Sequence, residues 1–340
     1  MNTVAPISLR RTAADTVAVR KQLLVLLGCA CAFAAHAGVT VDEHRPLVAT
    51  GRVYVNNIAG TVVVNSWDKN EVYLRGQLGD EADSIDIGGG SDNLSIVVKM
   101  PKKSHNSGES DLTLTVPSGA RVELETVSAD VSAQDLRGPV KVNTVSGTAL
   151  LQLSSPDVSV QSVSGDITLR GPSRMTFAKS VSGDMHLAGM QGKLVVETVS
   201  GNLQLDGGRF SDVHLKSVSG DMRLDVTLAQ TAQIIGDTLS GDITLDVPSD
   251  VSGTALLKSF SGDTSCDATL TTASASASAS ASAASGGISA GPPGRNGKRQ
   301  YVWGDGSGAR VELSSFSGDI RVLRKAVKGS QTPPPFVGKD

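Results

Sequence analysis

The chain is poor in aromatic residues and in cysteine, and its charge is nearly balanced. Aromatic side chains make up only 3% of the 340 residues, as two Trp, three Tyr and six Phe. Any core must therefore be built from Val, Leu, Ile and Ala. The formal net charge of −3 provides neither the basic surface typical of nucleic-acid binding nor an acidic tail. After residue 37 no apolar run reaches the eighteen residues that a membrane-spanning helix needs. Nucleic-acid-binding and membrane-spanning proteins are thus disfavoured.

The first 37 residues have the pattern of a secretion signal. Paired basic residues precede the apolar run "LLVLLGCACAFAA", which ends in a small-x-small cleavage site at Ala37. This predicts an extracytoplasmic protein, located in the periplasm, at the outer membrane or on the cell surface. A second interpretation, lipidation at Cys29 after "LLGC", stays open. Cleavage after Ala37 would leave Cys266 as the one remaining thiol, so the mature chain would form no internal disulfide.

A short corner motif recurs nine times from residue 127 onward. It consists of a hydroxyl residue, an apolar residue, Ser, Gly and an acidic or small polar residue, as in "SVSGD" at 180–184. The steps between copies are 18, 18, 18, 18, 19, 21, 21 and 56 residues. Such a period indicates a stack of equivalent units. The apolar corner residues are Val127, Val145, Val163, Val181, Val199, Val218, Leu239, Phe260 and Phe316.

Each repeat has the alternation of two short strands. In "VSVQSVSGDITL", Val158 and Val160 share one face before the corner, and Ile167 and Leu169 share one after it. Period-two alternation with β-branched residues predicts strands, and the Gly-containing breaks predict turns. The expected fold is an all-β, single-chain parallel β-solenoid with one coil per repeat. We expect right-handed coiling because parallel crossovers favour that hand, although a left-handed coil stays conceivable.

The corner residues themselves have a structural interpretation. The two hydroxyl positions are expected to form two columns that bond neighbouring coils. The glycine is expected to adopt a backbone conformation closed to larger residues, and the acid is expected to cap backbone N–H groups. Seven of the nine copies carry an acid: Asp130, Asp166, Asp184, Asp221, Asp242, Asp263 and Asp319.

A ladder of calcium ligands is the alternative interpretation of these acids. Thr148 and Asn202 interrupt the column and carry no charge, and the nonapeptide spacing of calcium-binding β-rolls is absent. The turn-cap interpretation is favoured, so no metal site and no cofactor are predicted.

Composition divides the chain into further segments. Residues 38–120 are predicted to form irregular N-terminal β rungs, with an early corner at Ile58-Ala59-Gly60-Thr61, and residues 121–272 the regular repeats. An Ala/Ser/Gly/Pro-rich insertion at 273–299 is expected to be disordered. Residues 300–325 then resume the solenoid as a last rung that closes its end, and the tail at 326–340 is expected to be disordered.

These motifs resemble a known family. The stretches "VNNIAGTVVVNSWDKNEV" and "LTLTVPSGARVELETVSAD", followed by the SGD series, are similar to the bacterial putative-adhesin family of β-strand-repeat proteins, a domain of unknown function. The similarity covers most of residues 45–325. It implies an extracytoplasmic β-solenoid without established catalytic residues, so it transfers no site to this chain.

No catalytic motif has the context that its chemistry requires. "GISAG" at 287–291 fits a nucleophile elbow but lies in the low-complexity segment, without the strand and helix that an elbow needs. "GDGSGA" at 304–309 imitates a dinucleotide loop but precedes a predicted strand instead of a helix. No P-loop is present. We therefore predict no catalytic, cofactor-binding or metal-binding residues.

Several single residues have competing interpretations. The histidines His44, His105, His186 and His214 do not pair at metal-ligand spacing, and the last two fall at outward positions. Cys266 takes the inward position that Leu245 holds one rung earlier, so a small buried residue is expected. Met175 and Phe177 lie on the outward parity of their strand, which indicates a local register shift or an exposed apolar patch; the shift is favoured.

The favoured function is a non-enzymatic, exported envelope or surface protein that acts as an adhesin or binding scaffold. Its partner would be an unknown envelope protein or a surface glycan. The alternatives are a polysaccharide-acting β-helix enzyme and a periplasmic scaffold for a protein partner. The scarcity of aromatic residues and the scatter of outward charges disfavour the enzyme.

Overall fold

The computed structural model describes residues 39–79, 84–99, 108–248, 251–266, 271–272, 298–303 and 306–325. All regular elements within these ranges are β-strands, which confirms the all-β class. The expected signal segment, most of the insertion and the C-terminal tail lie outside the described residues. The chain divides into two compact units, residues 1–151 and 152–340, and each is described by itself.

The first unit mixes parallel and antiparallel pairs. Its strands are β1 (Thr40–Pro46), β2 (Arg52–Trp67), β3 (Glu71–Gln77), β4 (Ser84–Gly89), β5 (Asn93–Lys99), β6 (Ser110–Pro117), β7 (Arg121–Gln134), β8 (Val140–Asn143) and β9 (Ala149–Gln152). Strand β2 pairs in parallel with β5, β6 and β7, and β7 pairs in parallel with β8. The pairs β1–β3, β3–β6 and β4–β5 are antiparallel, which the sequence did not predict.

The early corner predicted at residues 58–61 is confirmed. In the parallel ladder between β2 and β7, Gly60 lies opposite Ala129 and Thr61 opposite Asp130, both within the first corner of the regular series. Asn57, opposite Thr126, takes the place of the hydroxyl residue. It is fully buried, and its amide donates to the carbonyl oxygen of Ser110 at 2.9 Å. The first unit therefore already contains the repeat geometry.

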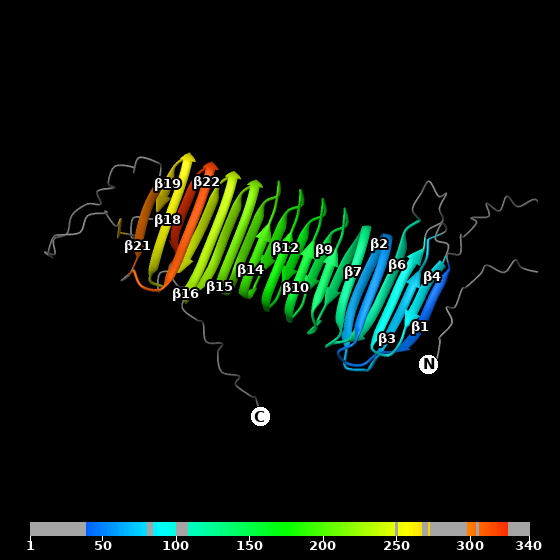
Figure 1. The fold of residues 1–340 in the computed structure, drawn as a ribbon. Coiled ribbons are helices and arrows are strands. Elements are labelled where there is room, and N and C mark those ends of the chain that lie inside the picture. Colours follow the sequence, from blue (N-terminus) through cyan, green and yellow to red (C-terminus); the bar gives the residue numbers. More distant parts are fainter. Residues whose placement is uncertain are drawn as a thin grey trace, which may run out of the picture. The chain divides into compact units, whose positions relative to one another are not determined.

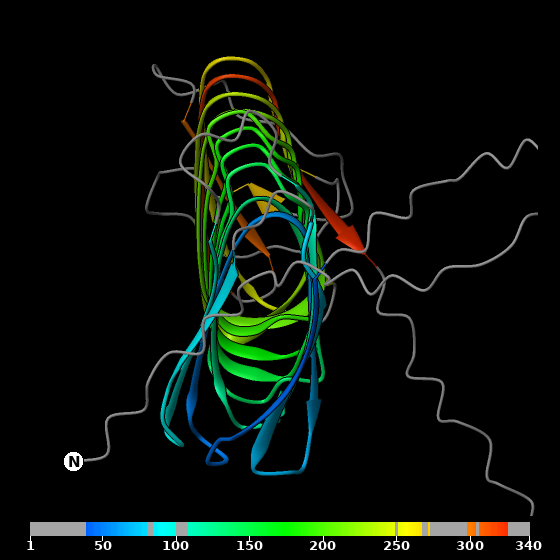
Figure 2. The ribbon, with the colours of Figure 1, turned by 90° about the vertical axis from the view of Figure 1, so that its right-hand side faces the viewer.

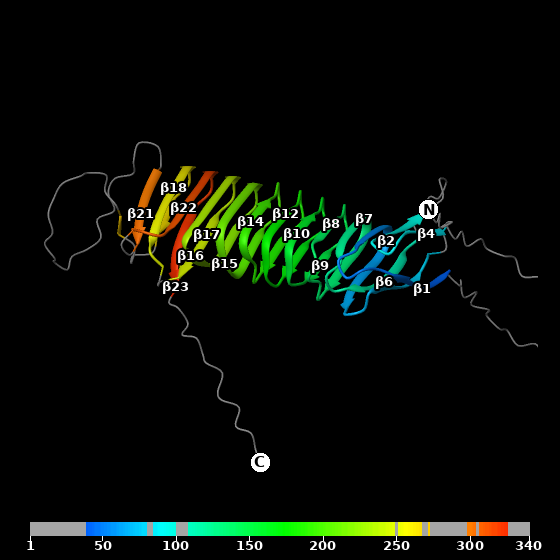
Figure 3. The same cartoon turned by 60° about the horizontal axis from the view of Figure 1, so that its bottom comes forward.

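The second unit consists of repeats that pair in parallel with one another (Figures 1 and 3). Its strands are β10 (Ser155–Gln161), β11 (Ile167–Arg170), β12 (Ser173–Lys179), β13 (Met185–Ala188), β14 (Gln191–Glu197), β15 (Leu203–Ser219), β16 (Met222–Ser240), β17 (Ile243–Pro248), β18 (Gly253–Ser261), β19 (Thr264–Cys266), β20 (Thr271–Thr272), β21 (Lys298–Trp303), β22 (Ala309–Ser317) and β23 (Ile320–Lys325). One ladder runs through the strands before the corners, from β10 to β12, β14, β15 and β16. The other runs through the strands after the corners, from β11 to β13, β15, β16 and β17.

The core of the second unit is a set of aliphatic columns. Because successive side chains of a strand point to opposite faces, each parallel ladder stacks the inward residues of all repeats. Figure 2 looks along this stack. One such column is made of residues that are each at most 2% exposed: Ile167, Met185, Leu203, Met222, Ile243 and Ile320.

The last repeat of the sequence does not close the end of the ladder, contrary to expectation. Strand β22 pairs in parallel with β16 on one side and with β18 on the other. Likewise, β23 lies between β17 and β19. Strand β21 follows β18 as an antiparallel neighbour, and it begins at Lys298, within the segment expected to be an insertion. The step of 56 residues between Phe260 and Phe316 is long enough for the chain to run back and add its last repeat between β16–β17 and β18–β19.

Ion pairs hold β23 in this inserted position. Lys325 Nζ lies 2.7 Å from Asp225 Oδ2 in β16 and 2.9 Å from Asp246 Oδ2 in β17. The Asp246 side chain is only 1% exposed, and Arg223 approaches the same oxygen to 3.5 Å. The hydrogen bond to Asp225, followed by that to Asp246, raises the pKa of Lys325. The lysine therefore stays charged and offsets the cost of burying Asp246.

The favoured register shift at Met175 is wrong. Thr176 and Ala178 are fully buried, so β12 keeps the parity of its neighbours, and Met175 is half exposed. Phe177 is also partly exposed. The inward position accepts Thr176 because its hydroxyl contacts Met190 Sδ at 3.5 Å. The apolar side chains on the outer face are therefore a surface feature.

Candidate functional site at the repeat corners

The first hydroxyl of each corner is buried, and in several corners it acts within its own turn. All nine of these residues are at most 8% exposed. The backbone N–H of Gly165 donates to Ser162 Oγ at 2.9 Å, and Gly183 donates to Ser180 Oγ at the same distance. A hydroxyl that accepts from an N–H three residues later fixes a tight turn. The expected hydroxyl column between repeats is therefore corrected at these corners, since their bonds are local; Ser259, which donates to a carbonyl oxygen of the neighbouring repeat, is an exception.

The second hydroxyl does connect neighbouring repeats, as predicted. The side chains of Ser146, Ser182 and Ser200 are exposed. They donate to the carbonyl oxygens of Val127, Val163 and Val181, at 3.1, 3.3 and 3.4 Å. Each acceptor belongs to the apolar residue of the preceding corner. The apolar position is thereby fixed to the serine of the next repeat.

The corner glycine is required by close stacking between repeats. A Cβ atom at Gly183 would lie 2.1 Å from Gly165 O, and one at Gly201 would lie 2.2 Å from Gly183 O. Positive φ angles occur at Gly220, Gly241 and Gly318 but not at Gly183 or Gly201. The expectation that backbone conformation alone selects glycine is therefore only partly correct. At most of these corners the neighbouring carbonyl leaves no room for a side chain.

The acidic column links successive corners through backbone N–H groups. Asp184 N donates to Asp166 Oδ1 at 2.9 Å, and Asn202 N donates to Asp184 Oδ1 at 2.8 Å. Asn202 can replace an acid in this column because its amide oxygen accepts the hydrogen bond from Asp221 N at 3.1 Å. The predicted capping role is confirmed, and the N–H that is capped belongs to the next repeat.

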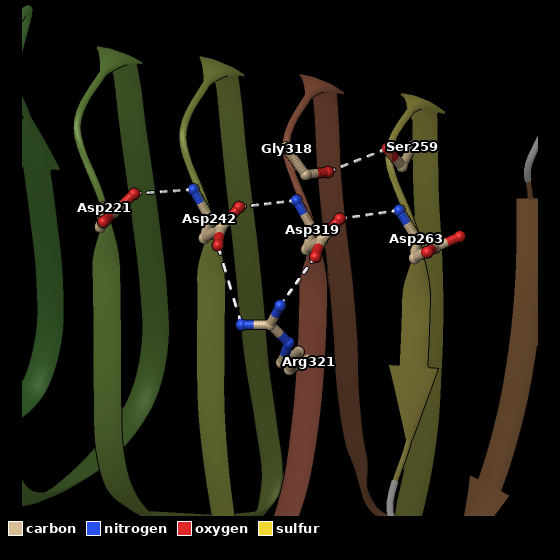
Figure 4. Close-up of polar contacts among 7 residues, drawn as sticks. All are labelled: Asp221, Asp242, Ser259, Asp263, Gly318, Asp319 and Arg321. Carbon is tan, nitrogen blue, oxygen red and sulfur yellow. Dashed lines mark hydrogen bonds and ion pairs between the residues drawn. The ribbon is translucent and has the colours of Figure 1, made fainter.

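Figure 4 shows the acidic column where the last repeat is inserted. Asp319 N donates to Asp242 Oδ1 at 2.8 Å, and Asp263 N donates to Asp319 Oδ1 at 2.9 Å. Arg321 contacts Asp319 Oδ2 at 2.7 Å and Asp242 Oδ2 at 3.7 Å. Ser259 Oγ also donates to Gly318 O at 3.0 Å. The inserted repeat thus reproduces the corner bonds of its neighbours. Within the described ranges no group of three His, Cys, Asp or Glu residues is placed to hold a metal ion.

The apolar residue of each corner points outward, and together these residues form the corner ridge. In the second unit the ridge consists of seven side chains whose exposed fractions lie between 40% and 78%. Phe260 and Phe316 end it as a stacked pair, with ring centroids 4.8 Å apart and an interplanar angle of 9°. In ladder order the ridge residues are Val163, Val181, Val199, Val218, Leu239, Phe316 and Phe260.

Sequence reasoning treated the ridge position only as a spacer within the corner. The structure shows that this residue and the following Ser both face outward at each corner of the second unit. Val127 and Val145 of the first unit are exposed in the same way, at 46% and 44%. The arrangement has no nucleophile or acid–base pair, and what it offers is an apolar strip edged by serine hydroxyls and carboxylates.

The histidines do not converge on a common site. His186 Nε2 lies 2.8 Å from Asp206 Oδ2, and His214 Nε2 lies 2.9 Å from Asp212 Oδ1. His44 stacks on a tyrosine ring in the first unit, and His105 lies outside the described residues. The outward positions predicted for His186 and His214 are confirmed by their partial exposure of 36% and 39%.

The remaining candidates also give no catalytic geometry. Cys266 aligns with Leu245 through Val322, which lies between them because β23 is inserted. It is half-buried rather than buried. Residues 309–317 after the glycine-rich stretch form strand β22, so no helix follows to bind a pyrophosphate. The "GISAG" segment lies outside the described residues.

The first unit contains a charged cluster on its outer face. Lys141 Nζ donates to Glu123 Oε1 at 2.9 Å, and Arg52 donates to Glu123 Oε2. These two hydrogen bonds, with that from Lys141 the larger effect, lower the pKa of Glu123. Tyr54 donates to Glu125 at 2.5 Å, which raises the pKa of the tyrosine. The cluster joins β2, β7 and β8 and has a structural role.

Comparison with known proteins gives one clear match. A family model described as Toastrack DUF4097 matches residues 56–323. No curated protein matches the chain. The part of the chain that the structure describes contains no helix long and apolar enough to cross a membrane.

Three solved structures are similar to this chain. A "putative adhesin" from Bacteroides fragilis is 14% identical, with a TM-score of 0.38, covering 84% of this chain and 97% of its own. A "putative lipid binding protein" from Parabacteroides distasonis is 13% identical, with a TM-score of 0.40, covering 61% and 89%. A "putative cell adhesion protein" from Clostridium sporogenes is 8% identical, with a TM-score of 0.20, covering 84% and 100%. Similarity at this level says nothing about ligand or activity.

Proposed function

Because the chain belongs to the Toastrack DUF4097 family, we propose that it is a non-enzymatic β-solenoid protein of the cell envelope or cell surface that acts as an adhesin or binding scaffold. The parallel ladders of each unit are what support the solenoid interpretation. The secretion pattern of residues 1–37 supports an extracytoplasmic location.

The corner ridge is the observation that carries the binding role. Soluble proteins rarely leave a continuous apolar strip in water unless a partner covers it. The ridge residues stack at about 4.8 Å intervals and remain at least 40% exposed despite their contacts with one another. The aromatic pair at its end, Phe260 and Phe316, adds a residue type that is enriched at protein interfaces.

The ridge also suggests what kind of surface it contacts. Serine hydroxyls and carboxylates accompany the apolar residues along the same corners. An extended partner with alternating apolar and polar groups would match this strip, and both an envelope protein and a surface glycan can present such groups. The lack of a catalytic constellation in the corner favours binding over turnover.

Site-specific photo-cross-linking in intact cells tests this proposal. We expect a photoreactive amino acid at position 239 or 260 to capture a discrete envelope component. The same group at Leu323, an exposed apolar position away from the corners, serves as the control and should capture much less. The triple variant Leu239→Ser, Phe260→Ser and Phe316→Ser should lower capture from a probe at position 218. Equal capture at position 323, or capture unaffected by the triple variant, would contradict the proposal.

A further inference from the structure

The second unit contains a groove at the turns that lie opposite the corners in each repeat. Its volume is about 520 Å³. Four successive repeats contribute to it, so it crosses the ladder and is open along its length for about 14 Å at the usual strand spacing. The groove is lined by Ser154, Ser155, Pro156, Pro172, Ser173, Arg174, Gln191, Gly192 and Arg209. It contains no residue of the corner ridge.

Small side chains create the hollow. Gly192 has a φ angle of +74°, and a Cβ atom there would lie 2.3 Å from Arg174 O. Ser155 and Ser173 are only 2% and 3% exposed. Their hydroxyls donate to the carbonyl oxygens two residues later, at 2.9 and 2.8 Å. Because these hydroxyls are held by their own strands, the serines form a fixed floor.

The groove carries two positive charges and no carboxylate. Arg174 and Arg209 are both exposed, and neither forms an ion pair within the described part of the chain. By contrast, Lys193 pairs with Asp212 at 3.3 Å, and Lys179 pairs with Glu197 at 3.1 Å. Two guanidinium groups without an ion pair thus lie at one groove whose lining residues include no carboxylate.

The spacing of the two arginines indicates a ligand with more than one charge. Gln191 pairs with Arg209 in the parallel ladder of β14 and β15. Ser173, the neighbour of Arg174 in the chain, lies one repeat before Gln191 and therefore two repeats away from Arg209. Two repeats correspond to about 10 Å. These are spacings of the backbone, and a groove that crosses four repeats has room for two anionic groups of one chain, one at each arginine. The rings of Pro156 and Pro172 line the groove in the first two of its four repeats, on the side of Arg174.

We propose that this groove binds the oxyanion groups of an acidic polysaccharide, with one carboxylate, sulfate or phosphate group on each arginine. Guanidinium groups bind such oxyanions through paired, charge-assisted hydrogen bonds. The exposed amide of Gln191 supplies further donors between the two charges. The groove thus gives the proposed binding protein a second, chemically defined ligand site, separate from the corner ridge.

Calorimetric titration of the whole chain at low ionic strength tests the groove. The probes are an oligogalacturonate, monomeric galacturonate, inorganic phosphate and a neutral maltooligosaccharide. We expect the oligogalacturonate to bind most tightly, with an affinity that falls as salt is added. The maltooligosaccharide should not bind. If phosphate or the monomer bound as tightly as the oligomer, the polymer proposal would be overturned in favour of a simple anion site.

Variants assign the binding to the arginines. Arg174→Gln and Arg209→Gln should each weaken oligogalacturonate binding about tenfold, as expected for a charge-assisted hydrogen bond. Arg170→Gln removes the same charge from an exposed position that does not line the groove and should change the affinity less than about twofold. Equal losses in all three variants, or no binding by the unaltered chain, would overturn the proposal. The melting temperature of each variant shows that it folds.

The groove proposal and the corner-ridge proposal can be contradicted independently of each other. The Arg174→Gln and Arg209→Gln double variant should keep the photo-cross-links from position 260, because the ridge is intact. Lost oligogalacturonate binding with retained cross-links supports the groove alone. Retained oligogalacturonate binding in the double variant contradicts the groove proposal, whether or not the cross-links from position 260 remain.

Discussion

At the scale of single residues, the corner glycine and the corner acid look equally regular but have different roles. The Cα of Gly183 lies against the preceding corner, where a Cβ atom would come within 2.1 Å of a carbonyl oxygen. The Asp184 carboxylate accepts one N–H from the next repeat, a bond that a neutral amide makes equally well at Asn202. A side chain at the glycine would push the stacked backbones apart and break ladder hydrogen bonds. The acid, in contrast, can be replaced by another residue that supplies an acceptor oxygen.

This difference predicts the order of two substitutions. Gly183→Ala should lower the free energy of unfolding by about 1–3 kcal/mol, the usual cost of overpacking. Asp184→Asn should cost less than about 1 kcal/mol, because the acceptor remains. Urea-induced unfolding measures both. Gly88→Ala is the control, since a Cβ atom there meets nothing within 4 Å. A larger loss for Asp184→Asn, or a calcium-dependent rise in melting temperature that this variant abolishes, would indicate a metal ladder instead.

Glu123 gives a pH-dependent prediction at the same scale. Its lowered pKa means that its ion pairs contribute stability above the unfolded-state pKa near 4.3, and that this stability is lost as the pH falls through the folded-state pKa. Glu123→Gln should therefore lower the free energy of unfolding by about 1 kcal/mol at pH 7, and the difference from the unaltered chain should shrink below about pH 4. Thermal melts from pH 7 to pH 3 measure this difference in stability.

The exposed Asp68→Asn variant is the control and should show no such pH dependence. A difference for Glu123→Gln that persists at pH 3 would refute the explanation.

At the scale of strands, the order of the last three repeats is the least expected feature. Consecutive repeats pair with each other up to β17, but β22 and β23 then come between β16–β17 and β18–β19. Hydrophobic columns alone do not decide this order, because β18–β19 carries the same inward pattern as β22–β23. The ion pairs of Lys325 with β16 and β17, and of Arg321 with the corner residue Asp242 between them, distinguish the two. Strand β19 has no counterpart to Lys325, since it ends at Cys266.

Engineered disulfides test this order directly. Neighbouring parallel strands place paired Cα atoms about 4.8 Å apart, within the range of a disulfide. Ser240 lies opposite Ser317, and Ser317 lies opposite Ser261. In a background with Cys29, Cys31 and Cys266 changed to serine, the cysteine pairs 240/317 and 317/261 should oxidise readily. The pair 240/261, two strands apart, should not. Efficient formation of the 240/261 bond would show that the repeats follow sequence order.

At the scale of the whole chain, the low-complexity segment should contribute little to stability. Its Ala, Ser, Gly and Pro residues offer little apolar surface to bury. The structure refines where a deletion can be made, because Thr271 pairs with Val302 and Arg299 donates to Thr264 O at 2.7 Å. Residues 274–296 should be replaceable by a four-residue Gly-Ser linker with a change in melting temperature of less than about 2 °C. Differential scanning calorimetry measures this, and a deletion that extends through Arg299 is the comparison expected to be less stable. A large loss for the shorter deletion would show that the segment packs on the fold.

The sequence alone determined the features that depend on neighbouring residues. The alternation around Val158 and Ile167 predicts strands, because the period of a strand is local. The repeated "SVSGD" predicts corners, because turn chemistry acts over a few residues, whereas the N–H that Asp184 caps lies in the next repeat. Even the irregular corner at Gly60 was recognisable, since it keeps the same spacing of apolar and small residues.

The tertiary structure alone decided which strands are neighbours. A strand edge accepts any partner with the same inward pattern, so the inward residues alone allow either β18 or β22 beside β16. In the structure β22 takes that place, and the Lys325–Asp246 ion pair accompanies it. For the same reason the antiparallel strands of the first unit, the true cause of the corner glycines and the groove at Arg174 and Arg209 were not predictable. Each depends on atoms that come close only after the chain has stacked, and local periodicity carries no information about such contacts.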